Sequence, residues 1–221
     1  LPDTFGYSWA LPQILKKSGV RAFFTTKLLW NDTNVFPHNS FVWEGIDGTR
    51  IAAHEPPVGL EGLVSPTHIR KAWDGFQEKE AGGHVLQTFG YGDGGGGPTK
   101  EHLEAARVLR TITGMPRTGL GTVRAFADEL IRREKSLPFW KGELYLEMHR
   151  GTYTTQAWVK RANRRAETML YTTELLASIA HVLGPRGYRY PAPALEEAWK
   201  KLLLNQFHDI VPGTSIPDVY D

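Results

Sequence analysis

Apolar and polar positions along the first 150 residues follow strand and helix patterns in turn. A β-branched and aromatic run over 20–26 predicts a buried strand, and apolar runs over 41–43 and 50–54 flank an Asp47-Gly48 turn that predicts a hairpin. A further strand is expected over 85–89, directly before a glycine-rich loop. Strands that alternate with helices indicate an α/β architecture in which the strand ends carry a site.

Polar caps and glycines place helices between these strands. Ser8 and Thr99 are suitable N-caps, because a side-chain oxygen at that position accepts a hydrogen bond from a free backbone N–H of the first turn. Gly82-Gly83 ends another helical stretch. The pattern therefore predicts four helices, over residues 8–17, 67–80, 99–113 and 125–134.

The pattern changes near residue 151. Residues 154–183 contain neither Gly nor Pro and carry apolar side chains at helical spacing, which predicts one helix of bundle length. A second helix with an apolar stripe is expected over 194–207. We therefore divide the chain into an α/β domain, 1–151, and an incomplete helical domain, 152–221.

Composition limits the class of protein. The 221 residues are 41% hydrophobic and 11% aromatic, which excludes an intrinsically disordered chain. Lys and Arg exceed Asp and Glu by only two and are mostly dispersed, so neither nucleic acid nor a membrane is expected as a partner. The chain has no cysteine, so a metal would need His, Asp or Glu ligands. It starts without Met, which suggests a piece of a longer protein.

Two segments of the α/β part are candidates for chemistry. Asp3 lies just ahead of a helix start, where it could equally stabilise the helix N-terminus. Around Asp93, five glycines within six positions let the backbone approach a ligand closely, although a flexible turn has the same composition. A phosphate cradle is less favoured, because 92–100 lacks the Gly-Lys-Ser/Thr ending of a P-loop.

Two more candidate segments lie near the second domain. Residues 140–153 combine aromatic, acidic and His side chains, as a sugar-binding wall or a solvated strand before a helix would. Residues 205–215 place His208 beside Asp209, next to a Pro-Gly break. A lone His at a helix C-terminus usually interacts with the helix dipole. With an Asp beside it, His208 becomes a candidate metal ligand.

Five motifs appear together in one order along nearly the whole chain. They are Leu-Pro-Asp-Thr-Phe-Gly-Tyr-Ser at 1–8, Trp-Asn and Phe-Pro-His within 30–38, Gly-Asp-Gly-Gly-Gly-Gly-Pro-Thr at 92–99, Gly-Glu-Leu-Tyr-Leu-Glu at 142–147, and Asn-Gln-Phe-His-Asp with Pro-Gly-Thr-Ser at 205–215. In these motifs the sequence resembles the class II α-mannosidases of glycoside hydrolase family 38, and within them the cysteine-poor intracellular and bacterial branch.

The resemblance implies a fold and an activity. The fold is α/β, part of a (β/α) seven-stranded barrel-like catalytic domain followed by helices of a three-helix bundle. The activity is that of a retaining α-mannosidase that hydrolyses terminal α-linked mannose from mannose-containing oligosaccharides. The implied location is the cytoplasm, or a vacuole reached from the cytosol, and the resemblance leaves open whether the protein is a homo-oligomer.

The resemblance also assigns the two carboxylates of a retaining mechanism. Asp3 matches the nucleophile and Asp93 the general acid/base. A retaining glycosidase needs one carboxylate to form a glycosyl-enzyme intermediate and a second, about 5 Å away, to protonate the leaving oxygen and then deprotonate water. Both residues follow or adjoin expected strands, where a barrel would bring them together.

A zinc ion (Zn²⁺) is the implied cofactor. Asp3 and His208 match zinc ligands, and the resemblance places Asp209, Phe5 and Lys27 at the substrate. Two further ligands would come from a His-x-Asp pair ahead of the nucleophile, and none of the eight His residues here is followed two positions later by Asp. We therefore expect a fragment that is inactive alone. The alternatives are a non-catalytic carbohydrate-binding remnant and a nucleotide-binding module built on the glycine loop.

Overall fold

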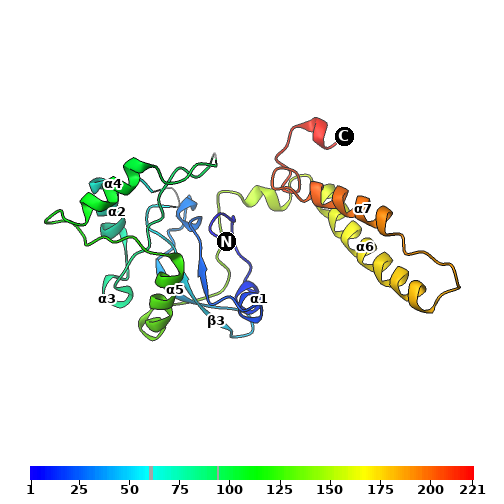
Figure 1. The fold of residues 1–221 in the computed structure, drawn as a ribbon, viewed down its shortest axis with the longest axis horizontal. Helices are drawn as coiled ribbons and strands as arrows, with labels where there is room; N and C mark the ends of the chain where they lie inside the picture. Colours follow the sequence, from blue (N-terminus) through cyan, green and yellow to red (C-terminus); the bar gives the residue numbers. More distant parts are fainter. Residues whose placement is uncertain (60–61, 94) are drawn as a thin grey trace. The chain divides into compact units, whose positions relative to one another are not determined.

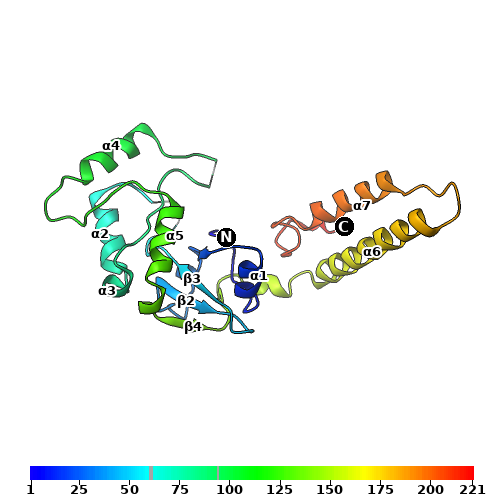
Figure 2. The ribbon, with the colours of Figure 1, turned by 60° about the horizontal axis from the view of Figure 1, so that its bottom comes forward.

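The computed structural model describes residues 1–59, 62–93 and 95–221. Over these residues, the unit Leu1–Met148 contains a mixed sheet of four strands (Figures 1 and 2). The β2–β3 pair is antiparallel and forms the predicted hairpin, with Gly48 at φ 83° in the turn. The outer strands β1 and β4 pair parallel with β3 and β2. In order across the sheet, the strands are β1 (Ala22–Phe24), β3 (Arg50–His54), β2 (Ser40–Glu44) and β4 (Phe139–Lys141).

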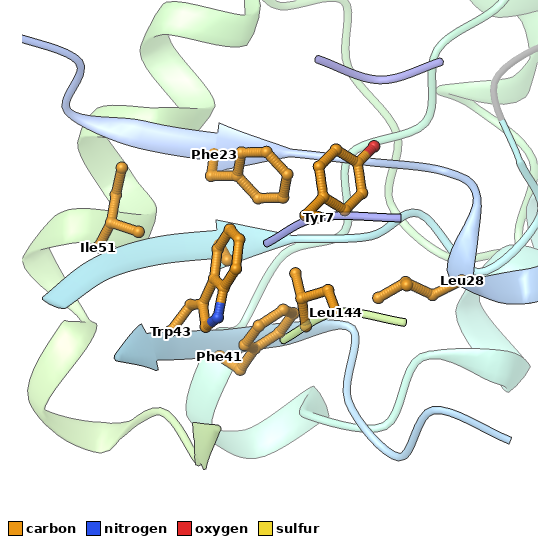
Figure 3. Packing of buried hydrophobic residues seen from close by; sticks show 8 residues of the cluster. Tyr7, Phe23, Leu28, Phe41, Trp43, Ile51 and Leu144 are labelled. Atoms are coloured by element: carbon orange, nitrogen blue, oxygen red, sulfur yellow. The ribbon is translucent and has the colours of Figure 1, made fainter. Parts of the chain in front are cut away.

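Apolar side chains cover both faces of the sheet. Successive residues of a strand point to opposite faces, so Phe41 and Trp43 join one core cluster while Val42 joins another. The larger cluster includes Tyr7 and Leu144, which come from segments outside the sheet (Figure 3). Because both faces are covered, the central strands read as continuous apolar runs.

Over the part of this unit that the structure describes, five α-helices accompany the sheet. Thr99 caps α4 as predicted: its hydroxyl accepts from the His102 backbone N–H, and the His102 ring accepts from the Thr99 backbone N–H, which makes a capping box. Helix α5 packs Leu130 into the second core cluster. The bounds are α1 (Leu11–Lys17), α2 (Pro66–Gly75), α3 (Lys79–Gly82), α4 (Lys100–Leu109) and α5 (Val123–Arg132), with single 3₁₀ turns η1 (Leu28–Trp30) and η2 (Glu134–Ser136).

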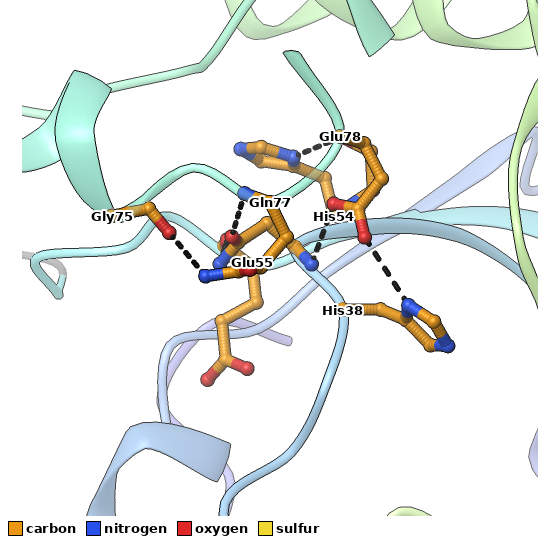
Figure 4. Close-up of polar contacts among 8 residues, drawn as sticks. His38, His54, Glu55, Gly75, Gln77 and Glu78 are labelled. Carbon is orange, nitrogen blue, oxygen red and sulfur yellow. Dashed lines mark hydrogen bonds and ion pairs between the residues drawn. The ribbon is translucent and has the colours of Figure 1, made fainter. Parts of the chain in front are cut away.

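The prediction of a single helix over 67–80 is wrong, because the structure has two helices, α2 and α3, in this region. The helical stretch breaks after Gly75, where Phe76 is extended and fully buried. The break turns Glu78 toward the start of β2, where its carboxylate accepts hydrogen bonds from the backbone N–H groups of Asn39 and Ser40, each at 2.9 Å (Figure 4). These long-range contacts outweigh local helix propensity.

Two other expected elements differ from the structure. The segment 85–89 is not a strand: Leu86 donates its N–H to the His54 ring, and Phe89 makes a single bridge. The helix expected from residue 8 begins at Leu11, because the Ser8 hydroxyl accepts from the nearby N–H of Ala10 instead of capping the helix.

The second unit, His149–Asp221, is a helical hairpin. The long helix α6 (Ala157–Leu183) and α7 (Ala192–Asn205) match the two helices expected from the apolar spacing, with the 3₁₀ turns η3 (Arg150–Tyr153) before them and η4 (Pro217–Val219) after them. Trp199 of α7 donates to the Glu174 carboxylate of α6 at 2.8 Å. The chain as a whole is mixed α/β. Among the described residues, no helix is both long enough and apolar enough to span a bilayer.

Candidate functional site

The first residues of the chain lie along the turn that follows β1. The Tyr7 hydroxyl donates to the Leu1 carbonyl at 2.7 Å and lies 2.6 Å from the Thr25 hydroxyl. Burial raises the pKa of Tyr7 to about 12, so it keeps this proton. Thr26 donates both its N–H and its hydroxyl to the Pro2 carbonyl. These contacts fix the backbone carbonyls of the two residues that precede Asp3.

Asp3 forms an ion pair with Lys27. The Lys27 ammonium lies 2.7 Å from the Asp3 carboxylate and 3.5 Å from the centre of the Trp30 ring, with the Phe5 ring centre at 5.0 Å. The Lys27 side chain is only 9% exposed, whereas that of Asp3 is 60% exposed. A largely buried cation between two aromatic faces is strongly oriented. It therefore holds a carboxylate that is itself open to a ligand.

The glycine loop places Asp93 at the surface of the same unit. Tyr91 and Gly97 are joined by a backbone hydrogen bond of 3.2 Å across the base of the loop. A side chain at Gly96 would meet Tyr91 at 2.8 Å, so this glycine is needed for the loop to close. Gly94, the loop residue after Asp93, lies outside the described residues.

His208 and Asp209 lie in the second unit, in the turns that follow α7. Both side chains are exposed, and the His208 ring nitrogen Nε2 lies 3.6 Å from the Asp209 carboxylate. Gln206 anchors the preceding residues by donating to Asn163 at 3.0 Å and to Glu167 at 2.8 Å on α6. This anchor was not predicted from the sequence, although Asn163 and Glu167 are spaced to share one helix face.

The structure thus brings Asp3, Phe5 and Lys27 together, while His208 belongs to the other unit. Over residues 1–59, 62–93 and 95–221, no three His, Asp or Glu side chains group closely enough to hold a metal ion. Asp3 and His208 have the donor chemistry that zinc prefers, but the described residues do not complete a zinc site.

Two buried carboxylates that contact the residues following Lys27 were not given a role from the sequence. Glu55 follows the apolar strand β3 and accepts a hydrogen bond of 3.0 Å from the backbone N–H of Leu29, with its carboxylate turned away from Glu78 (Figure 4). Glu147 accepts from the backbone N–H groups of Thr33 and Asn34. Glu55 could have been found from the sequence, because it directly follows a buried strand and a Glu is rarely buried without a partner.

Replacing Glu55 with Gln should remove a pH-dependent loss of stability. Burial raises the pKa of Glu55 from 4.5 to about 8, so the folded protein prefers the neutral acid. This contribution to stability is complete below pH 4.5 and is lost as the pH rises through about 8. Gln keeps an acceptor for Leu29 and cannot ionise.

We expect Glu55→Gln to be more stable than wild type by an amount that grows over this pH range, on the order of 2 to 4 kcal/mol. Hydrogen exchange of β1 and η1, compared between variant and wild type at each pH, measures the difference. A difference that does not change with pH would contradict the buried-acid interpretation.

Two family models match consecutive parts of the chain. The model described as "Glycosyl hydrolases family 38 N-terminal domain" matches residues 1–143, and "Alpha mannosidase middle domain" matches residues 147–221.

Curated proteins match over nearly the whole chain. "Alpha-mannosidase 2C1" of Homo sapiens is 45% identical over 98% of this chain, and "Alpha-mannosidase" of Saccharomyces cerevisiae is 42% identical over 100% of it. The chain spans 21% of the length of each of these relatives. Among solved structures, an α-mannosidase from Enterococcus faecalis V583 aligns with a TM-score of 0.73 and 19% identity, over 100% of this chain and 26% of that one. This last similarity shows the fold alone.

Proposed function

The chain belongs to glycoside hydrolase family 38, and from that premise we propose that it is part of a retaining α-mannosidase that removes terminal α-linked mannose from oligosaccharides. The observation that carries this proposal is the match of two family domains, in order, over residues 1–143 and 147–221. Within that assembly, the four-stranded sheet would be part of a seven-stranded (β/α) barrel-like domain. Helices α6 and α7 would be two members of a three-helix bundle.

Asp3 would be the nucleophile of this reaction. Its carboxylate oxygen attacks the anomeric carbon of mannose, and the bond to the leaving oxygen breaks as the glycosyl-enzyme ester forms. The ion pair with Lys27 supports this role because it fixes the direction of the carboxylate. Phe5 and Trp30 add aromatic surface beside it, suited to the apolar face of a sugar ring.

Asp93 would be the general acid and base. As an acid it donates a proton to the leaving oxygen, and as a base it then removes a proton from the water that hydrolyses the glycosyl-enzyme. A carboxyl group on a surface loop of the same unit as Asp3 is suited to this exchange of protons with substrate and water.

We propose zinc as the cofactor of the full-length enzyme, with Asp3 and His208 as two of its ligands and Asp209 beside the substrate hydroxyl groups. A tetrahedral site needs four donors, so the others would come from the part of the longer protein that this chain does not span. The 221-residue chain alone is therefore expected to bind zinc no better than micromolar and to hydrolyse no α-mannoside.

An assay with an aryl α-mannoside tests the proposed function. The full-length protein that contains this chain should hydrolyse the substrate, lose activity in a chelator and regain it with Zn²⁺. An aryl β-mannoside and an aryl α-glucoside serve as matched controls for anomer and sugar. Binding of mannose without turnover of any aryl α-mannoside would support the non-catalytic carbohydrate-binding alternative instead.

A further inference from the structure

The short segment 27–34 carries both Lys27 and Trp30, and buried carboxylates contact it from two directions. The 3₁₀ turn η1 lies near its start, closed by a hydrogen bond of 3.1 Å from the Trp30 N–H to the Lys27 carbonyl. Glu55 accepts the N–H of Leu29 within the turn. Glu147 contacts the residues that follow the turn.

Glu147 accepts several hydrogen bonds from the residues after the turn. Its two oxygens accept the backbone N–H of Thr33 at 2.7 Å and that of Asn34 at 3.1 and 3.2 Å, and the Asn34 side-chain amide donates to it as well. The Glu147 backbone N–H donates to the Asn31 side chain at 2.9 Å. The link thus runs in both directions between two segments more than a hundred residues apart.

The charge of Glu147 is satisfied by these donors. Glu147 is 4% exposed, and its described partners are the amide groups of Thr33 and Asn34 together with the Asp32 side chain. Hydrogen bonds from the Asn34 amide and the Thr33 backbone N–H lower the pKa of Glu147 to about 2, which favours its ionised form. An ionised group with this many donors fixes the loop more tightly than a neutral acceptor would.

The loop that Glu147 fixes carries one wall of the Lys27 site. Asn31 directly follows Trp30, and its side-chain amide donates to the Tyr145 carbonyl at 3.3 Å. Trp30 in turn lies 3.5 Å from the Lys27 ammonium, which is paired with Asp3. A displacement of the loop would therefore reach the Asp3 carboxylate through Trp30 and Lys27.

We propose that Glu147 is a positioning residue for the reaction, acting through the 31–34 loop and Trp30 to hold Lys27 against Asp3. This inference rests on the proposed function and adds a residue to its machinery. Because Glu147 is proposed to act on Asp3 through Lys27, its effect on the reaction depends on Lys27 being present.

Substitution in the full-length enzyme tests this dependence. Glu147→Gln keeps the shape of the side chain but replaces one acceptor oxygen with a donor that faces the Thr33 or Asn34 N–H. We expect kcat on an aryl α-mannoside to fall by about 10- to 30-fold with a smaller change in KM, because a misplaced nucleophile slows the chemical step. Glu80→Gln, the same substitution at an exposed residue of the same unit with no assigned role, is the matched control and should retain wild-type activity.

A double-mutant cycle with Lys27→Met separates positioning from general destabilisation. If Glu147 acts through Lys27, then Glu147→Gln should cost no more than about twofold once Lys27 is replaced. Effects that multiply would overturn the proposal in favour of a purely structural role. Wild-type kcat in Glu147→Gln would also overturn it.

Asn34→Ala tests the same link between Glu147 and the 31–34 loop if Glu147→Gln does not fold. Asn34 is exposed, and its replacement removes one donor to Glu147 without leaving a buried charge unpaired. We expect a threefold to tenfold loss of kcat that again disappears with Lys27→Met, and additive losses would contradict the proposal. An inactive wild-type enzyme would reject the proposed function itself, an outcome distinct from an active enzyme that tolerates Glu147→Gln.

Discussion

Asp3→Asn should abolish turnover of α-mannosides by the full-length enzyme. Asn has nearly the same shape but is a poor nucleophile and carries no charge for Lys27, which lies 2.7 Å away in the wild-type protein. Loss of a covalent catalyst is expected to cost about 5 to 7 kcal/mol of barrier, or about 10⁴- to 10⁵-fold in kcat. Steady-state kinetics with an aryl α-mannoside measures the loss.

Asp128→Asn is the matched control for this substitution. Asp128 also pairs with a basic side chain, Arg21, at 2.8 Å in the same unit, but it lies on the surface and has no assigned role. Exposed ion pairs contribute little to stability, so the control should keep nearly full activity. Asp3→Asn activity within tenfold of wild type would rule out Asp3 as the nucleophile.

Asp93→Ala should slow hydrolysis by an amount that depends on the leaving group. Substrates with very good leaving groups need no proton from the enzyme, so their glycosylation should stay close to wild type while poor leaving groups lose about 10²- to 10⁴-fold. Deglycosylation then limits turnover, and azide should restore part of the rate because it attacks the intermediate without a general base.

A series of aryl mannosides of graded leaving-group pKa measures this dependence. Asp74→Ala, which removes another exposed carboxylate of the same unit, should show no such dependence. If substrates with good and poor leaving groups slowed by the same factor in Asp93→Ala, Asp93 would not be the acid.

Turn residues, helix caps and apolar spacing were sufficient to predict the elements whose conformation depends on neighbouring residues. The Asp47-Gly48 turn specified the β2–β3 hairpin, because a glycine at positive φ is what such a turn requires. The Thr99 cap and the uninterrupted apolar spacing of α6 were predicted for the same reason. Each of these signals lies within a few residues of the structure it specifies.

The features that could not be predicted from the sequence depend on contacts between segments far apart in the chain. The helix break at Phe76 depends on Glu78 reaching the start of β2, almost forty residues earlier in the chain. Glu147 contacts Thr33 across 114 residues, so no spacing rule could assign it to the 31–34 loop. The Asp3–Lys27 pair was expected from the resemblance alone, because an Asp near a helix start has a simpler local explanation.

Identification of the residue that becomes covalently attached to the sugar tests the central claim most directly. A fluorinated mannosyl fluoride forms the glycosyl-enzyme quickly and releases it slowly, so the intermediate can accumulate in the full-length enzyme. After proteolysis, mass spectrometry should find the added sugar on the peptide that contains Asp3, and on that side chain. An active enzyme that carries the sugar on another residue, with the Asp3 peptide unmodified, would contradict the account.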